Sequence, residues 1–233
     1  MCIAGGMIRD IGGGSEIATG RSEGSHRGVR PVATHQHLYY EGDDRTHVFV
    51  VESGWVKLYR TLIDGQRQIV GFANAGSVLG LESEDAYCNG CEAITPVAML
   101  AIPVERIRDL SRTDAKFADD LLRQVGRQLG AAQRQIATIG VQSAEQKLAT
   151  FLISIADLCG AGAGGEFDLP MRRGDMGEFL GLRVETISRK MTEFQRRGWI
   201  SMPSVYHCRL LRRDILEELA DGGEIEVSPV RCA

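Results

Sequence analysis

The segment from Arg173 to Gly198, RGDMGEFLGLRVETISRKMTEFQRRG, restricts the fold of this chain more than any other stretch. Gly177 supplies the small residue that two closely crossing helices require, and Gly181 suits a turn with left-handed backbone angles. Apolar residues then fall at the positions expected to face a core: Met176, Leu180, Leu182 and Ile187. The spacing predicts a helix-turn-helix whose second helix begins near Val184.

Charge is concentrated in the same part of the chain. Between Met171 and Arg213 there are ten lysine and arginine residues against four acids, a net charge of +6. The rest of the chain must then carry −10, because the net charge of all 233 residues is −4. A basic segment on an acidic protein is typical of a phosphate-binding face, although a solvated charged helix can show the same charge.

The first turns of the second helix carry side chains whose chemistry suits DNA base edges. An arginine can donate two hydrogen bonds to guanine, a glutamate can accept from cytosine, and a valine can contact a thymine methyl group. We expect the base-reading residues to be Val184, Glu185, Ser188 and Arg189. We expect the phosphate contacts to come from Arg173, Arg183, Thr186, Arg196, Arg197, Arg209, Arg212 and Arg213. The alternative is a helix pair with surface contacts between arginine and glutamate and no DNA.

A long helix is predicted upstream, with apolar residues in alternating steps of four and three. This heptad seam consists of Ala118, Leu122, Val125, Leu129, Ala132, Ile136 and Ile139. Such a seam favours a parallel coiled coil between two copies of the chain, and a helix packed on its own domain is the alternative. A two-fold dimer is what a reader of palindromic half-sites requires.

The region before this helix has a different texture. Short β-rich runs alternate with glycine turns, and IDGQ between two of them indicates a hairpin. Near the C-terminal end, WISMPSVYHCRLLRR alternates like a second hairpin. The chain is therefore expected to be α+β, with a β-sandwich or β-roll followed by helices and a winged C-terminal domain. The predicted boundaries are a flexible arm over 1–30, a β-roll over 31–110, a dimerisation helix over 111–142, a winged helix over 143–220 and a tail over 221–233.

Other functional classes find less support in the sequence. No Ser-His-Asp constellation, H-E-x-x-H motif or phosphate loop is visible, so we do not expect an enzyme. No apolar run is long enough for a membrane span and no secretory signal is evident, so we expect a cytoplasmic protein without a membrane partner. Cys88 and Cys91 form a C-x-x-C pair that is either two ordinary thiols or a redox or metal site. Cys208, in the predicted wing, is a weaker candidate for regulatory oxidation.

The stretch RRGDMGEFLGLRVETISRKMTEFQRRGWI closely resembles the superfamily of the cyclic-AMP receptor protein and the fumarate–nitrate reduction regulator (CRP/FNR), in its FNR/FixK branch. The resemblance runs from about residue 32 to 220. It implies a β-roll like that of cyclic-nucleotide-binding domains, a dimerisation helix and a winged helix-turn-helix. It also implies that Glu185, Ser188 and Arg189 read TTGA-type half-sites. Two positions depart from the pattern: Arg183 replaces a Thr or Ser that caps the recognition helix, and Lys190 replaces an apolar residue.

The sensor region departs further from those relatives. The N-terminal arm offers only Cys2, and Leu100 stands at the place of the fourth cluster ligand, so an FNR-type iron–sulfur cluster is not expected. Near the place of the Arg-Ser pair that holds cyclic AMP stand Cys91 and Glu92, so cyclic AMP is not expected either. The cofactor and the signal stay open.

The resemblance implies a homodimeric transcription regulator, typical of an activator in an oxygen- or redox-related regulon. Its expected partners are promoter DNA, a second copy of the chain, and RNA polymerase, which would contact exposed β-roll loops around 64–68. The alternative is a dimeric ligand-binding, redox or haem sensor module whose DNA role is secondary.

Overall fold

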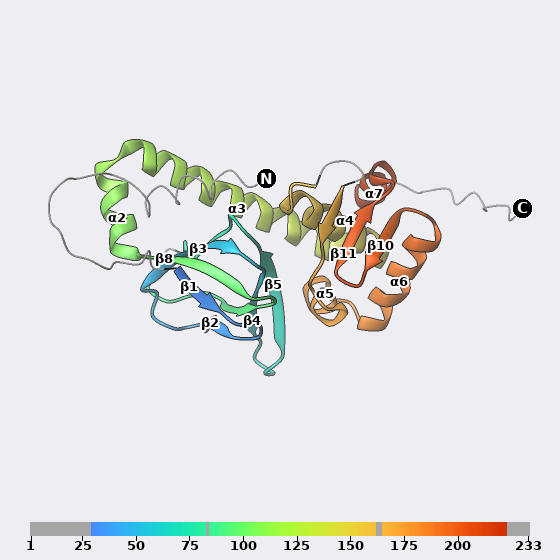
Figure 1. Ribbon diagram of the computed structural model, residues 1–233, viewed down its shortest axis with the longest axis horizontal. Helices are drawn as coiled ribbons and strands as arrows, with labels where there is room; N and C mark the ends of the chain where they lie inside the picture. The colour runs from blue at the N-terminus through green and yellow to red at the C-terminus, as the bar shows by residue number, and fades with distance from the viewer. Residues whose placement is uncertain (1–28, 83, 162–164, 223–233) are drawn as a thin grey trace, which may run out of the picture. The chain divides into compact units, whose positions relative to one another are not determined.

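The computed structural model describes residues 29–82, 84–161 and 165–222, and on the long helix it describes the side chains up to Gln133 except Arg127 and Ala131. The chain divides into two compact units, with the boundary between Gln133 and Arg134. Figure 1 shows the strands of the first unit in blue to green and the second unit in yellow to red.

Two antiparallel four-stranded sheets form the N-terminal roll. One sheet has the order β1 (Val29–Val32), β8 (Val97–Pro103), β3 (His47–Ser53), β6 (Val78–Leu79). The other has the order β2 (His37–Tyr39), β7 (Gly90–Ala93), β4 (Val56–Thr61), β5 (Arg67–Ala73). The predicted hairpin is confirmed, because β4 pairs with β5 and the amide of Leu62 donates to the carbonyl of Gln66 across the turn.

Strand β3 is buried on both faces, and this double burial explains why its sequence is a continuous apolar run. Phe49 and Val51 face the core between the sheets, whereas Val48 and Val50 face a second cluster under the helices. Between the sheets, the ring of Tyr39 stacks on that of Tyr87 with 3.9 Å between centroids. Aromatic side chains therefore fill the interior of the roll at the described residues.

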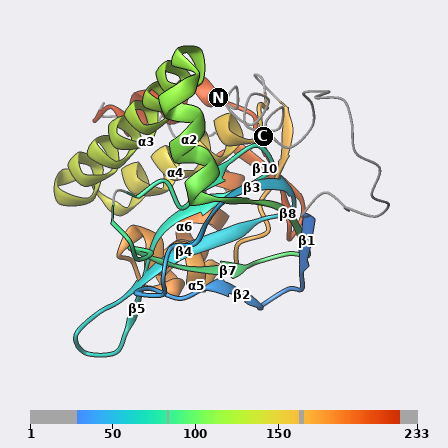
Figure 2. The same cartoon turned by 90° about the vertical axis from the view of Figure 1, so that its left-hand side faces the viewer.

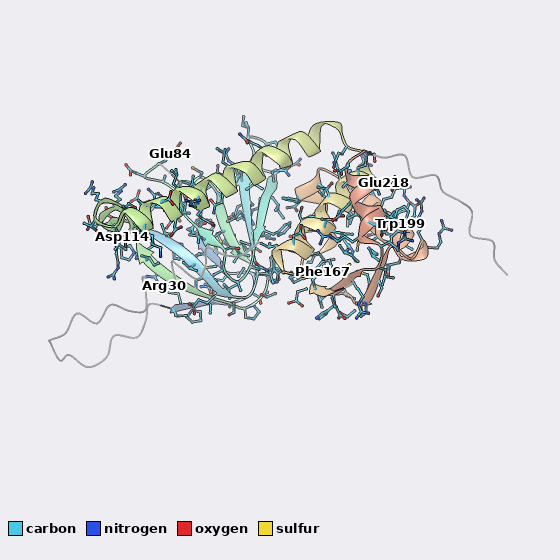
Figure 3. All side chains as sticks on the ribbon, turned by 90° about the horizontal axis from the view of Figure 1, so that it is seen from above. Arg30, Glu84, Asp114, Phe167, Trp199 and Glu218 are labelled. Carbon is cyan, nitrogen blue, oxygen red and sulfur yellow. The ribbon has the colours of Figure 1, made fainter. Side chains whose placement is uncertain are left out.

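Two helices follow the roll, α2 (Val104–Thr113) and α3 (Ala115–Val141). Figure 2 shows both on the same side of the strands, where Ile107 and Phe117 pack on the cluster that contains Val48. The long helix was predicted from residue 111, but it begins at Ala115. Asp114 is extended (φ −123°, ψ 101°), and its carboxylate accepts from the amide of Phe117 at 3.0 Å, which caps the new helix. Figure 3 marks Asp114 at this break.

The second unit holds four helices and a small sheet among its described residues. The helices are α4 (Ala144–Leu158), α5 (Arg173–Leu180), α6 (Val184–Arg196) and α7 (Arg213–Ala220). The sheet has the order β10 (Ile200–Ser204), β11 (His207–Leu210), β9 (Glu166–Asp168). The β10–β11 hairpin was predicted and β9 was not. Figure 3 marks Phe167 on β9 and Trp199 just before β10, both buried.

Candidate nucleic-acid interface

The turn between α5 and α6 has the geometry that its two glycines predicted. Gly181 ends α5 with left-handed angles (φ 65°, ψ 38°). Gly177 lies against the next turn of chain, because a Cβ on it would come within 2.6 Å of the carbonyl oxygen of Leu182. The amide of Leu182 in turn donates to the carbonyl of Gly177 at 2.9 Å. The helix-turn-helix is thus closed by backbone contacts that any larger side chain at Gly177 would break.

Helix α6 has one buried face and one exposed face. Ile187, Met191 and Phe194 are buried in the domain core. The four predicted base-reading residues lie together on the exposed side: Val184, Glu185, Ser188 and Arg189. Val184 is 42% exposed despite its apolar side chain. Among the described residues, the side chains of Glu185, Ser188 and Arg189 form no hydrogen bond or ion pair, so they are available to a partner.

The N-terminus of α6 lacks a side-chain cap. Arg183 occupies the N-cap position with extended backbone angles and makes no capping hydrogen bond. The first amides of α6 therefore stay free to bind an anion such as a DNA phosphate. Arg183 itself is exposed, as is Arg196 at the other end of the helix, and Thr186 is half-buried.

The remaining predicted phosphate residues are engaged within the domain. Arg209 pairs with Glu166 at 3.3 Å, and Arg212 pairs with Asp214 at 2.8 Å. Both pairs are exposed and can exchange their carboxylate for a phosphate at little cost. Arg173 is partly buried, burial lowers its pKa, and its Nη1 lies 3.2 Å from the sulfur of Met176.

Arg197 and Arg213 are held more firmly within the domain. Arg213 joins Asp157 on α4 at 2.8 Å and Glu217 at 2.7 Å. Arg197 pairs with Glu193 and its guanidinium lies 4.7 Å from the ring centroid of Trp199. Their side chains are only 25% and 19% exposed, respectively. Both arginines therefore already have carboxylate partners within the domain, and their assignment as phosphate contacts stays a prediction.

The wing contributes residues that the sequence analysis did not name. At the tip of the β10–β11 hairpin, Val205 and Tyr206 are exposed. His207 fixes this tip, since its Nε2 lies 3.2 Å from Asp168 on β9 and its Nδ1 lies 3.0 Å from the hydroxyl of Ser204. In the sequence, the wing tip could have been recognised from the apolar pair Val205-Tyr206 in an otherwise polar turn. Cys208 points inward and is buried, and burial raises its pKa to about 12.

Helix α3 carries two distinct apolar stripes. One stripe, with Phe117 and Leu121, packs on the roll, and the amide of Gln128 donates to the carbonyl of Val78 at 3.0 Å. The predicted seam is a second stripe, in which Leu122 is 70% and Leu129 is 58% exposed. Val125 and Ala132 are also exposed, and Ala118 is half-buried. Ile136 and Ile139 lie outside the described side chains.

The C-x-x-C pair lies in and beside β7, with its two thiols in different environments. Cys91 is fully buried in the core of the roll, and burial raises its pKa to about 12. Cys88 is half-buried, and its pKa is also raised by burial. No group of three or more His, Cys, Asp or Glu residues within the described ranges is placed to hold a metal ion. Neither thiol is therefore activated as a thiolate.

Glu92 follows Cys91 and points to the other face of the sheet. Its carboxylate lies 3.4 Å from Lys57 and 3.4 Å from Arg67, with His35 at 3.4 Å and His37 at 3.9 Å. These side chains come from or beside β2, β4 and β5, and Lys57 and Arg67 are the cations among them, so the carboxylate links the strands of this sheet. The residue expected near a phosphate site is thus already neutralised by protein cations.

No helix within the described part of the chain is both long and apolar enough to cross a membrane.

Comparisons with known proteins match both units. Residues 29–114 match a cyclic nucleotide-binding domain, and residues 146–219 match a Crp-like helix-turn-helix domain. The nitrogen fixation regulation protein FixK of Rhizobium meliloti is 31% identical over 198 residues, which cover 83% of this chain and 89% of that protein. Electron transport regulator A of Shewanella oneidensis is 32% identical over 181 residues, covering 76% of this chain and 72% of that protein.

A solved structure agrees with these relatives. FixK2 from Bradyrhizobium japonicum superposes with a TM-score of 0.77 at 28% identity, covering 82% of this chain and 96% of that chain. The relatives are regulators of transcription rather than enzymes, and their names include the fumarate and nitrate reduction regulatory protein of Vibrio cholerae and the anaerobic regulatory protein of Aggregatibacter actinomycetemcomitans. The chain belongs to the CRP/FNR family of DNA-binding transcription regulators, in its FNR/FixK branch.

Proposed function

We propose that the chain binds, as a homodimer, a pseudo-palindromic promoter site built from TTGA-type half-sites. One observation carries this proposal: Glu185, Ser188 and Arg189 share an exposed face of α6 without partners in the described structure, while neighbouring arginines such as Arg197 and Arg213 are paired. These three residues match the E-x-x-S-R pattern of the FNR branch. Arg189 pairs with guanine, Glu185 with a cytosine amine, and Val184 with a thymine methyl group.

Phosphate contacts then come from groups around this face. Arg183 and Arg196 flank it from the two ends of α6, and the uncapped amides at the start of α6 can bind a phosphate. Arg209 and Arg212 lie in exposed pairs that a phosphate can replace. The tip of the wing, with Tyr206, reaches the adjacent backbone. These contacts set affinity and orientation, whereas the α6 face sets sequence preference.

The dimer is supported by the exposed seam of α3. Leu122 and Leu129 lie on one stripe of this helix and are 70% and 58% exposed. Exposed apolar surface is unfavourable in water, and a second copy of the helix buries it. Among the described residues, Phe117 and Leu121 pack α3 on the roll, whereas Leu122 and Leu129 of the seam stay exposed. The dimer in turn presents two α6 helices to two half-sites.

Regulation is proposed along the lines of the relatives. Transcriptional activator protein FnrA of Stutzerimonas stutzeri is 32% identical over 173 residues, and this supports an activator that contacts RNA polymerase. The β4–β5 hairpin suits that contact, since Leu62 is exposed and Ile63 is fully exposed beside the predicted loop 64–68. The target genes are proposed to belong to an oxygen- or redox-linked response, which is supported by relatives such as the anaerobic regulatory protein of Aggregatibacter actinomycetemcomitans.

The proposal is tested by titrating the purified full-length chain with a duplex that carries two TTGA-type half-sites and with a scrambled duplex. Tight, salt-dependent binding with a clear preference for the half-site duplex supports it. Equal binding of both duplexes contradicts it and favours the alternative sensor module.

A further inference from the structure

Lys190 is the unusual residue of the recognition helix, because a lysine stands next to Arg189 yet faces away from the base-reading side. Successive residues of an α-helix are about 100° apart, so Lys190 and Arg189 point in different directions. The Lys190 side chain is only 20% exposed. Its ammonium donates to Glu145 on α4 and to Glu193 on α6, the latter at 2.9 Å.

Glu145 is itself held in a fixed place. It lies in the first turn of α4, which starts with a reciprocal cap: the hydroxyl of Ser143 accepts from the amide of Gln146 at 3.3 Å, and the amide of Ser143 donates to the Gln146 side chain at 2.7 Å. Just upstream, the Gln142 side chain donates to the carbonyl of Ala220 at the end of α7 at 2.8 Å. The partner of Lys190 therefore belongs to a rigid corner of the domain.

Glu193 extends the contact along the same side of α6. It accepts from Lys190 and pairs with Arg197, whose guanidinium stacks on Trp199. Hydrogen bonding from Lys190 is the main cause that lowers the pKa of Glu193. The apolar contacts of Ile187, Met191 and Phe194 hold α6 on the core, and the ion pairs of Lys190 and Glu193 lie beside these contacts. Charged hydrogen bonds with fixed geometry restrict the rotation and tilt of α6.

We propose that Glu145, acting through Lys190, is a positioning residue that sets the orientation of α6, so that sequence preference in DNA binding depends on an ion pair that does not touch DNA. This proposal rests on the proposed function and adds a determinant of specificity to it. A small rotation of α6 moves the tips of Arg189 and Glu185 relative to the base edges, whereas phosphate contacts at the ends of the helix tolerate such a shift. Loss of the pair should therefore lower preference more than it lowers non-specific affinity.

The test uses full-length variants Glu145→Gln, Lys190→Met and Lys190→Arg. Asp157→Asn serves as the matched control, because Asp157 is also on α4 and forms an ion pair, but with Arg213 on α7 rather than with α6. Thermal unfolding establishes that each variant folds. Affinities for a half-site duplex and a scrambled duplex are then measured at two salt concentrations.

We expect Glu145→Gln and Lys190→Met to lower the ratio of specific to non-specific affinity about tenfold, with the salt slope on scrambled DNA unchanged. Lys190→Arg and Asp157→Asn should keep the ratio of the natural protein. Where Lys190→Met fails to fold, Glu145→Gln, which retains the contact between Lys190 and Glu193, decides the question.

Three results would overturn the proposal. If folded Glu145→Gln and Lys190→Met keep the natural ratio within twofold, the pair has no positioning role. If Asp157→Asn loses as much preference as they do, the effect is general destabilisation. If Lys190→Met weakens both duplexes equally and reduces the salt slope, Lys190 is a phosphate contact. By contrast, if the natural protein shows no sequence preference in DNA binding, the proposed function itself is wrong.

Discussion

Gly177 on α5 and Leu182 beyond the turn are in backbone contact, with 2.6 Å between the Leu182 carbonyl oxygen and the place of a Gly177 Cβ. A backbone atom cannot move aside as a flexible side chain can. The closeness of α5 and α6 thus depends on the absence of one methyl group, and the orientation of the base-reading face depends on that closeness.

Gly177→Ala should destabilise the DNA-binding domain by about 1–3 kcal/mol, because the methyl group forces the turn apart. Gly174→Ala is the control on the same helix. A Cβ there meets nothing within 4 Å, so it should be neutral or stabilise the domain by about 0.5–1 kcal/mol. Both variants are made in a Trp55→Phe background, so that the fluorescence of Trp199 reports on this domain. Urea unfolding followed by this fluorescence gives the stability of each variant. Equal stability of the two variants would contradict the account of the turn.

Leu129→Glu should dissociate the dimer, since it places two carboxylates near the two-fold axis of the α3 seam. Operator binding should fall with it, while the roll stays folded. Lys116→Glu places a glutamate on an exposed part of α3 outside the seam, with an even larger charge change of −2 against −1, and should leave the dimer intact. Light scattering measures the mass of both variants in solution. A dimeric Leu129→Glu protein would show that the seam packs within one chain instead of between two.

Acid should weaken the DNA-binding domain through Glu193. The pKa of this carboxyl is lowered by its hydrogen bond from Lys190, so its contribution to stability is complete above its unfolded pKa of about 4.5 and is lost as pH falls through the lower folded value. Glu193→Gln should be less stable than the natural protein at pH 7, and this difference should shrink below about pH 4. Urea midpoints of both proteins across this pH range measure the difference in stability. A difference that grows toward low pH would contradict the prediction.

The thiols should react in a set order. Cys91 and Cys208 are buried with pKa values raised to about 12, so iodoacetamide at pH 7.5 should leave both unmodified in the folded protein. Cys88, half-buried in a loop, should react slowly, and all three should react in urea. Peptide mass spectrometry reads the result. Rapid labelling of native Cys91 would show that the C-x-x-C pair opens, and would favour its redox role.

Local patterns in the sequence predicted much of the fold. Three kinds of feature depend only on residues a few positions apart, and the sequence displays such patterns directly. They are the glycine turn, the β4–β5 and β10–β11 hairpins, and the exposed seam. The end of α2 at Asp114 was missed, because one aspartate both breaks one helix and caps the next. Strand β9 was missed since its three residues are too short for a pattern.

The candidate site was predictable in part for the same reason. The exposed face with Arg189 follows from helical periodicity. The pairing of arginines does not, because their partners are distant along the chain: Asp157 lies 56 residues before Arg213, and Glu145 lies 45 residues before Lys190. A count of basic residues therefore overestimates the number of free phosphate contacts, and only folding shows which cations are already paired.

The most direct test of the central claim compares Arg189→Ala with Arg196→Ala on the half-site duplex and on one with the guanine replaced, at two salt concentrations. Both arginines are exposed on α6 without partners in the described structure, but Arg189 lies with the base-reading residues in the first turns, whereas Arg196 lies about two turns further, at the C-terminal end of the helix. Loss of a bidentate contact removes about 1–3 kcal/mol per half-site, or about 2–6 kcal/mol for the two half-sites of a dimer. Arg189→Ala should therefore lose about 30-fold to more than 10⁴-fold in specific affinity, together with its preference for guanine. Arg196→Ala should weaken both duplexes alike and reduce the salt slope by about 1 per subunit. If Arg189→Ala instead weakens both duplexes equally and keeps the preference for guanine, Arg189 binds phosphate and the assignment of base reading is wrong.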